Sequence, residues 1–206
     1  MVARILDSIK ELVKQYERRN YDVIYAHHLD RPVWVALEEK GIPESILNNE
    51  FVLIGELVHR GLASVVFKAD PVCKRIQLKP WIVEELDERV RDRWVRDDRH
   101  PYVVVCGNAD GMIPYDQRLV PVELKTTRRS GGYPPEWFTR SELYAWLYNA
   151  PVTLLAILNL KDAFEVDYYV KNPGDIVITA RVVDWLRGKW PQATSRIDDF
   201  VKVVEL

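Results

Sequence analysis

The chain has little cysteine. Only two cysteines, Cys73 and Cys106, occur among its 206 residues. Two thiols are too few for a four-cysteine zinc site or an iron–sulfur cluster within one chain, and they give no disulfide framework. We therefore expect both cysteines to be buried thiols.

Long apolar runs and an excess of positive charge are also missing. The first residues, MVARILDSIKELVKQYERR, alternate apolar and charged groups at helical spacing and lack the apolar core of a signal peptide. No other stretch is long and apolar enough to span a bilayer, so we expect a cytoplasmic protein with no membrane partner. The formal charge of −2 and the pI near 6.1 mean that only local basic patches could hold nucleic acid.

The apolar pattern indicates an α/β fold. Hydrophobic residues make up 48% of the chain, enough for one core. Helices are expected in the N-terminal part and near 136–149 and 175–186, an edge strand over 72–83, three consecutive strands of one sheet over 102–127, and two more over 152–170. We expect one domain over 1–206, with N-terminal helices in 1–50, the core in 51–170 and a C-terminal helical segment in 171–206.

The most informative segment is GNADGMIPYDQRLVPVELKTT, which contains Asp110, Glu123 and Lys125. Twelve residues separate Asp110 from Glu123, a gap that suits a strand, a turn and a neighbouring strand. The two carboxylates are then expected to meet on adjacent strands. Glu123 and Lys125 are two residues apart, so on a strand they project to the same face.

Phosphodiester hydrolysis uses such a set of groups. Mg²⁺ and Mn²⁺ prefer carboxylate and carbonyl oxygens, and they polarise a phosphoryl group and activate water. Asp110, Glu123 and the backbone carbonyl of Leu124 are the candidate ligands, and Lys125 is the candidate to orient the water or offset charge on the phosphate. A Glu-x-Lys pair also occurs on solvated strands, but the apolar VPV before Glu123 favours a functional pair.

Basic and aromatic residues follow the second strand of this segment. Arg128 and Arg129 come directly after it and Arg140 lies on the next helix, where they would meet phosphates or simply face solvent. The aromatic residues of the same region are Tyr133, Trp137 and Phe138. These rings would either stack on unpaired bases or cover the sheet.

Four motifs in this order, GELVH, GNAD, ELK and the aromatic ELYAW, resemble the RecB-like branch of the PD-(D/E)XK nucleases. The resemblance is closest to the fourth CRISPR-associated protein family, exonucleases of spacer acquisition, and spans about residues 30–170. It implies a central mixed sheet flanked by helices, DNA with single-stranded or frayed ends as substrate, and CRISPR integrase proteins as candidate partners; a homo-oligomer is compatible with it. It also implies that His59 of GELVH is a metal ligand, whereas a lone histidine on an apolar helix is more often a core residue.

The chain departs from this family at two places. The family's Q-x-x-x-Y motif corresponds either to Glu142 and Trp146 or to Tyr144 and Tyr148, and neither alignment restores the glutamine. Tyr144 and Tyr148 are then expected either to contact substrate or to pack in the core. The family's iron–sulfur cysteines are missing, with Asp30 near the position of the first, so no cluster is expected.

Three functions remain open from the sequence. The leading hypothesis is a deoxyribonuclease that depends on Mg²⁺ or Mn²⁺. The alternatives are a catalytically degenerate module of the same fold that binds DNA or a protein partner, and a metal-dependent hydrolase of another substrate.

Overall fold

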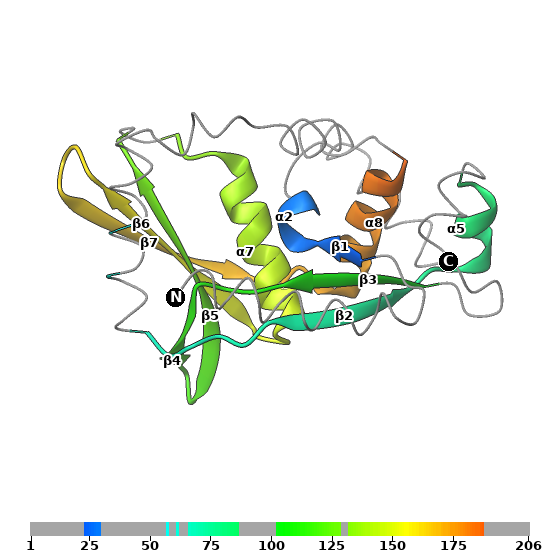
Figure 1. The fold of residues 1–206 in the computed structure, drawn as a ribbon, viewed down its shortest axis with the longest axis horizontal. Helices are drawn as coiled ribbons and strands as arrows, with labels where there is room; N and C mark the ends of the chain where they lie inside the picture. The colour runs from blue at the N-terminus through cyan, green and yellow to red at the C-terminus, as the bar shows by residue number, and fades with distance from the viewer. Residues whose placement is uncertain are drawn as a thin grey trace.

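The computed structural model describes residues 23–29, 57, 61, 66–86, 102–128 and 132–187 (Figure 1). The helices and strands of these residues are β1 (Val23–Tyr25), α2 (Ala26–Leu29), β2 (Val72–Gln77), α5 (Pro80–Glu84), β3 (Tyr102–Gly107), β4 (Gly111–Tyr115), β5 (Arg118–Thr127), α7 (Pro135–Leu147), β6 (Val152–Asn159), β7 (Phe164–Lys171) and α8 (Gly174–Leu186). The expected helices within 1–22 and 30–50 lie outside these residues. Within the described ranges, no helix has both the length and the apolar character to cross a bilayer.

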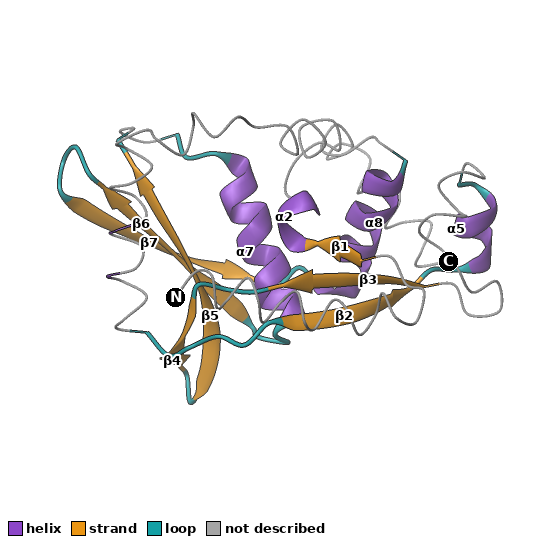
Figure 2. Cartoon of the chain, in the orientation of Figure 1, coloured by secondary structure: helices purple, strands orange, loops and turns teal. Residues whose placement is uncertain are grey.

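The described strands form two mixed sheets, which lie beside the helices in Figure 2. The first has the order β1-β3-β2, with β1 parallel and β2 antiparallel to β3. The second has the order β4-β5-β6-β7, in which only β5 and β6 are parallel. The α/β class is therefore confirmed.

The prediction that the strands over 102–127 belong to one sheet is wrong, because β3 lies in the first sheet and β4 and β5 lie in the second. The chain leaves β3 at Gly107 and passes through Asn108 and Ala109 outside any strand. The Ala109 N–H donates to the Tyr148 hydroxyl at 3.1 Å, so a side chain takes the place of a strand partner there. The crossing between the sheets is thus held by α7 and the residues that follow it.

The strand expected over 72–83 is present but shorter. β2 lies at the edge of its sheet, as predicted, and ends at Gln77. Pro80 then begins α5. Proline suits the first turn of a helix, where its missing N–H has no partner to lose, and it cannot continue a strand ladder.

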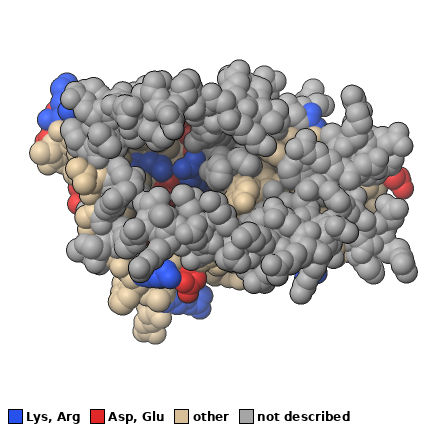
Figure 3. Space-filling model, in the orientation of Figure 1, with Lys and Arg blue, Asp and Glu red and all other residues tan. Residues whose placement is uncertain are grey.

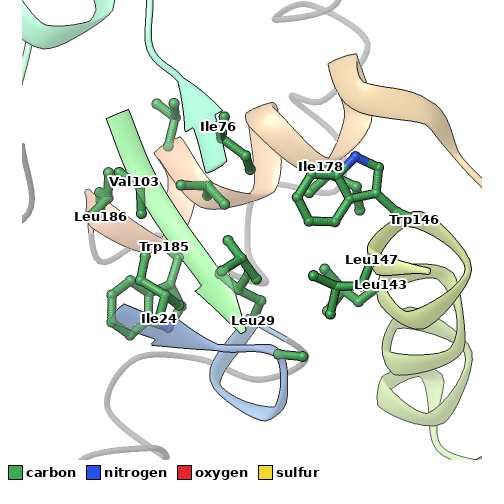
Figure 4. Packing of buried hydrophobic residues seen from close by; sticks show 14 of the residues in the cluster. Ile24, Leu29, Ile76, Val103, Leu143, Trp146, Leu147, Ile178, Trp185 and Leu186 are labelled. Atoms are coloured by element: carbon green, nitrogen blue, oxygen red, sulfur yellow. The ribbon is translucent and has the colours of Figure 1, made fainter. Parts of the chain in front are cut away.

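The largest apolar cluster lies between the first sheet and the helices. Side chains from β1, α2, β2, β3, α7 and α8 converge there, as Figure 4 shows. Its members labelled in that figure are Ile24, Leu29, Ile76, Val103, Leu143, Trp146, Leu147, Ile178, Trp185 and Leu186. The Trp146 indole N–H also donates to Asp175 at 2.6 Å, which ties α7 to α8. Because α7 packs on β5, β6 and β7 as well, it connects this core to the second sheet.

The two cysteines form a disulfide, so the prediction of two buried thiols is wrong. Cys73 on β2 lies directly opposite Cys106 on β3 in the antiparallel register. Their Cα atoms are 4.1 Å apart, although the residues are 33 positions apart in sequence. A pairing set by the register of two distant strands has no local sequence signal, which is why the spacing alone did not predict it.

Candidate active site

The β4–β5 hairpin brings the two predicted carboxylates together. Its strands pair from Gly111 with Val122 to Tyr115 with Arg118, and residues 116 and 117 form the turn. Both turn residues have positive φ, 45° and 63°, as a two-residue type I′ turn requires. The tight turn fixes the register, and that register sets residue 110 beside residue 123.

Asp110 is held on β5 by two hydrogen bonds. Its N–H donates to the carbonyl of Val122, the register partner of the next residue, at 3.0 Å, so Asp110 stays bonded to β5 just beyond the ladder. Its Oδ2 accepts the Leu124 N–H at 2.8 Å. The carboxylate is thus fixed beside Glu123, where the sequence predicted that the two would meet.

Glu123 is a buried carboxylate flanked by two cations. Its side chain is 2% exposed. The Lys125 ammonium donates a short hydrogen bond to Glu123 Oε1, and a guanidinium nitrogen of Arg140 lies 3.6 Å from the same oxygen. Glu123 and Lys125 therefore share one face of β5, and α7 brings Arg140 over that face. Figure 3 shows basic and acidic side chains beside each other in the left half of the molecule, where Figure 1 places β5 and α7.

The electrostatic balance at Glu123 has opposing parts. Burial is the largest cause and raises the pKa of Glu123 above its usual value. The Lys125 and Arg140 cations lower this pKa, while the nearby Asp110 carboxylate raises it. The raised pKa shows that the two cations do not fully offset the cost of burying the charge. An added positive charge at this position would favour the ionised carboxylate.

The oxygens around Asp110 and Glu123 suit a hard divalent cation. In a strand, the N–H and C=O of one residue point to the same edge, so the Leu124 carbonyl faces the edge where its N–H meets Asp110. Two carboxylates and a carbonyl are the ligand types that Mg²⁺ and Mn²⁺ prefer. In the part of the chain that the structure describes, no group of three or more His, Cys, Asp or Glu side chains gathers. His59, the third predicted side-chain ligand, lies outside the described residues.

The two faces of α7 differ. Arg140 and Tyr144, four residues apart, face the site: Arg140 approaches Glu123, and the charge of Glu123 acts on Tyr144. Glu142 instead pairs with Arg181 of α8. Trp146, which one alignment with the Q-x-x-x-Y motif pairs with Glu142, also faces α8, because its indole N–H donates to Asp175. The helix positions at the site are therefore 140 and 144, a pair that neither sequence alignment contained.

Tyr144 belongs to both the core and the edge of the site. Its side chain is 7% exposed and lies in the main apolar cluster. Burial first, and then the Glu123 charge, raise the pKa of Tyr144 well above its usual value. A Cβ added at Gly107 would lie 3.1 Å from the Tyr144 ring and 2.8 Å from Leu147, so a larger residue there would force these side chains of α7 to shift.

Tyr148 holds the chain just before Asp110. Its hydroxyl accepts the Ala109 N–H and donates to the Asp70 carbonyl at 2.6 Å. Burial is the main cause that raises the pKa of Tyr148 to about 12. The sequence left Tyr148 open between substrate contact and core packing; in the structure its hydroxyl positions the connection between the two sheets.

The structure does not place the two arginines after β5 at the candidate site. Arg128 follows the last residue of β5 and is exposed. Arg129 lies outside the described residues. Of the three predicted phosphate-binding arginines, the structure thus places Arg140 at the carboxylates.

Comparisons with known proteins bear on the fold alone. No protein-family model matches the chain. No curated protein matches it. A solved structure described as the crystal structure of SSO0001 is similar, with a TM-score of 0.58 and 19% sequence identity over 87% of this chain and 83% of that chain. At this identity the likeness shows a shared fold.

Proposed function

We propose that this protein is a divalent-metal-dependent deoxyribonuclease of the PD-(D/E)XK type that acts as an exonuclease on single-stranded or frayed DNA ends. The observation that carries the proposal is the meeting of Asp110 with the buried Glu123, beside Lys125 and Arg140. The motif resemblance supports the nuclease class. The preference for DNA ends and a partnership with CRISPR integrase proteins depend on that resemblance alone, and the proposed cytoplasmic location depends on the lack of long apolar runs in the sequence.

The charges of the four side chains fit phosphodiester hydrolysis. Asp110 and Glu123 carry two negative charges, and Lys125 and Arg140 carry two positive charges, so the set is formally neutral. A bound divalent cation would leave two positive charges. Attack of hydroxide on a phosphodiester produces a dianionic transition state, which this excess positive charge would stabilise in a site of low dielectric constant.

The protein groups have separate roles in this proposal. Asp110, Glu123 and the Leu124 carbonyl would hold Mg²⁺ or Mn²⁺, which supplies a Lewis acid for the phosphoryl oxygen and the attacking water. Lys125 would hold that water through its ammonium protons. Arg140, whose planar guanidinium suits phosphate oxygens, would bind the scissile phosphate. Tyr148 would act indirectly, by holding the backbone before Asp110.

The experiment is degradation of end-labelled single-stranded and duplex DNA in Mg²⁺, Mn²⁺ or EDTA. We expect wild-type cleavage in either metal, none in EDTA, and loss of cleavage in Asp110→Ala and Lys125→Ala. The matched controls are Asp167→Ala, at an exposed position of β7, and Lys161→Ala, in the exposed turn after β6. Both controls should cleave like the wild type.

Other outcomes of this experiment would favour one of the two alternative functions or a different active site. DNA binding without cleavage in any metal would overturn the nuclease and favour a degenerate DNA-binding module. Cleavage that survives in both Asp110→Ala and Lys125→Ala would move the active site elsewhere. Metal-dependent hydrolysis of simple phosphodiesters with no action on DNA would favour a hydrolase of another substrate.

A further inference from the structure

One row of side chains extends from the candidate active site across the second sheet. Glu123 on β5 pairs with Leu155 on β6, and Leu155 pairs with Tyr168 on β7. Directly paired residues project to the same face of a sheet, so Tyr168 lies on the same face as Glu123. Neighbouring strands are about 4.8 Å apart, which places the two backbone positions roughly 10 Å apart.

Tyr168 and three other aromatic residues form a chain of ring contacts. The Tyr168 ring centroid lies 5.2 Å from that of Phe138 and 6.1 Å from that of Tyr133, in edge-on arrangements. Tyr133 in turn stacks on Trp137 at 6.0 Å. We call these four residues, Tyr133, Trp137, Phe138 and Tyr168, the aromatic patch. It joins the start of α7 to the edge strand β7.

The aromatic patch is not part of the core. None of its four members lies in, or packs against, the clusters of buried hydrophobic residues in the described part of the chain. Tyr168 is 36% exposed and the other three rings are half-buried. The rings therefore keep surface that a ligand can cover.

Helix α7 links the aromatic patch to the site. Trp137, Arg140 and Tyr144 are spaced by three and four residues, so they form one stripe along the helix. Trp137 lies at the patch end of this stripe, and Arg140 approaches Glu123. A ligand on the rings would thus meet a phosphate-binding cation one helical turn away.

The two faces of β7 differ in charge. On the side of the aromatic patch the strand presents Phe164, Val166, Tyr168 and Val170, and on the other side Glu165, Asp167, Tyr169 and Lys171. Tyr169 contacts Tyr115 on that second side, at 5.1 Å between ring centroids. Asp167 and Lys171 flank Tyr169 on that second face and Glu165 lies beyond Asp167, so the strand presents a net charge of −1 there, whereas the face of Tyr168 carries no charged residue of this strand. A phosphate backbone is therefore repelled less on the Tyr168 face.

We infer that the aromatic patch binds the unpaired bases of a DNA strand whose scissile phosphate lies at Asp110 and Glu123. This inference deepens the proposed function and depends on it for the position of the phosphate. Rings accept any base by stacking, and a base-paired duplex hides the faces of its bases. The patch would therefore select single-stranded DNA over duplex DNA at the same site.

The test is the affinity of the full chain for labelled DNA, measured by fluorescence anisotropy in EDTA so that no cleavage occurs. Tyr168→Leu keeps apolar volume but removes the ring, and we expect it to weaken binding of single-stranded DNA roughly 5- to 150-fold. Tyr168→Phe keeps the ring and should bind like the wild type. Tyr169→Leu is the matched control, because it removes the neighbouring ring from the opposite face of the same strand, and it should change the affinity less than twofold.

A strand with abasic sugars in place of nucleosides gives the second comparison. The wild type should bind the abasic strand about as weakly as Tyr168→Leu binds the normal strand. Tyr168→Leu should not lower the affinity for the abasic strand any further. Three outcomes would overturn the inference. They are equal loss of affinity in Tyr168→Leu and Tyr169→Leu, an equal loss in Tyr168→Leu for abasic and normal strands, and no binding of single-stranded DNA by the wild type. Thermal melting of each variant would show whether lost affinity reflects unfolding.

The two proposals can fail separately. Wild-type binding that depends on Tyr168, without cleavage in any metal, would leave the aromatic patch in place and overturn the nuclease. Metal-dependent cleavage with Tyr168→Leu binding like the wild type would do the reverse.

Discussion

The two sheets differ in what their side chains do. In the first sheet, the central strand β3 buries every residue but its first, and its side chains contribute to apolar clusters and a disulfide. The second sheet carries the carboxylate pair and Lys125 on β5 and ends in β7, most of whose residues are exposed. The largest apolar cluster and the disulfide thus lie with the first sheet and the candidate chemistry with the second, although β6 also buries most of its residues. The two regions meet where the chain crosses between the sheets, directly before Asp110.

This division predicts that truncation in the largest apolar cluster lowers stability more than truncation at an exposed position of the second sheet. Ile24 of β1 is fully buried in the main cluster. Ile24→Ala should lower the free energy of unfolding by about 2–5 kcal/mol, from lost burial and the cavity that remains. Leu119→Ala, at a side chain 51% exposed on β5, should change it by less than about 0.5 kcal/mol. Urea unfolding measures both, and similar losses in the two variants would contradict the division.

The disulfide provides the next largest effect. Reduction of Cys73–Cys106 releases a constraint between residues 33 apart and should lower the free energy of unfolding by about 2–4 kcal/mol. Because the bond lies within the first sheet, cleavage well below the melting temperature should persist after reduction. The measurement is urea unfolding with and without reductant. A double Cys73→Ala, Cys106→Ala variant is the control, since reductant should not affect it.

Arg140 of α7 tests the candidate chemistry of the second sheet. Arg140→Met keeps most of the apolar stem but removes the cation 3.6 Å from Glu123. We expect single-turnover cleavage at saturating metal to slow about 10- to 100-fold, the usual cost of losing a group that supports a metal ligand. Arg118→Met, at the exposed start of β5, should cleave normally. Equal rates in the wild type and Arg140→Met would remove Arg140 from the mechanism.

Tyr148 gives the smallest effect and the one that depends on pH. Tyr148→Phe removes the hydroxyl bonds to Ala109 and Asp70 and should cost about 1 kcal/mol at neutral pH. The raised pKa means that the folded protein keeps this proton at a pH where the unfolded chain loses it. Its stabilising contribution is therefore complete below about pH 10, the ordinary tyrosine value, and is lost as pH rises through about 12.

Urea unfolding at neutral and alkaline pH measures this effect. Stability should fall more steeply in the wild type than in Tyr148→Phe over the alkaline interval. Parallel pH profiles would show that the hydroxyl does not carry this contribution.

Local signals predicted much of the fold. The period of apolar residues and the turn residues located β6, β7, α7 and α8 close to their observed bounds. The short β1 was missed, because three residues carry no periodicity and its partner β3 lies far along the chain. The division into two sheets was missed for the same reason, since alternation predicts a strand but not the identity of its partner.

The candidate site shows the same limit. Asp110 and Glu123 were predicted to meet because a hairpin is a local structure. Arg140 was included among the basic residues, but its approach to Glu123 depends on how α7 crosses β5, which the sequence does not specify. The orientation of Glu142 toward Arg181 depends in turn on where α8 packs.

The hairpin also restricts which insertions and deletions related genes can tolerate between the two carboxylates. Five residues on each strand and two in the turn make up the twelve residues between Asp110 and Glu123. Lengthening both strands by one residue, or by any equal number, would keep the two positions opposite each other. One extra residue in a single strand would turn Glu123 and Lys125 to the other face, away from α7, unless a bulge absorbed it. Homologous sequences with an active site should therefore differ by even numbers of residues in this interval, and odd differences should coincide with a bulge, an altered turn or a lost carboxylate.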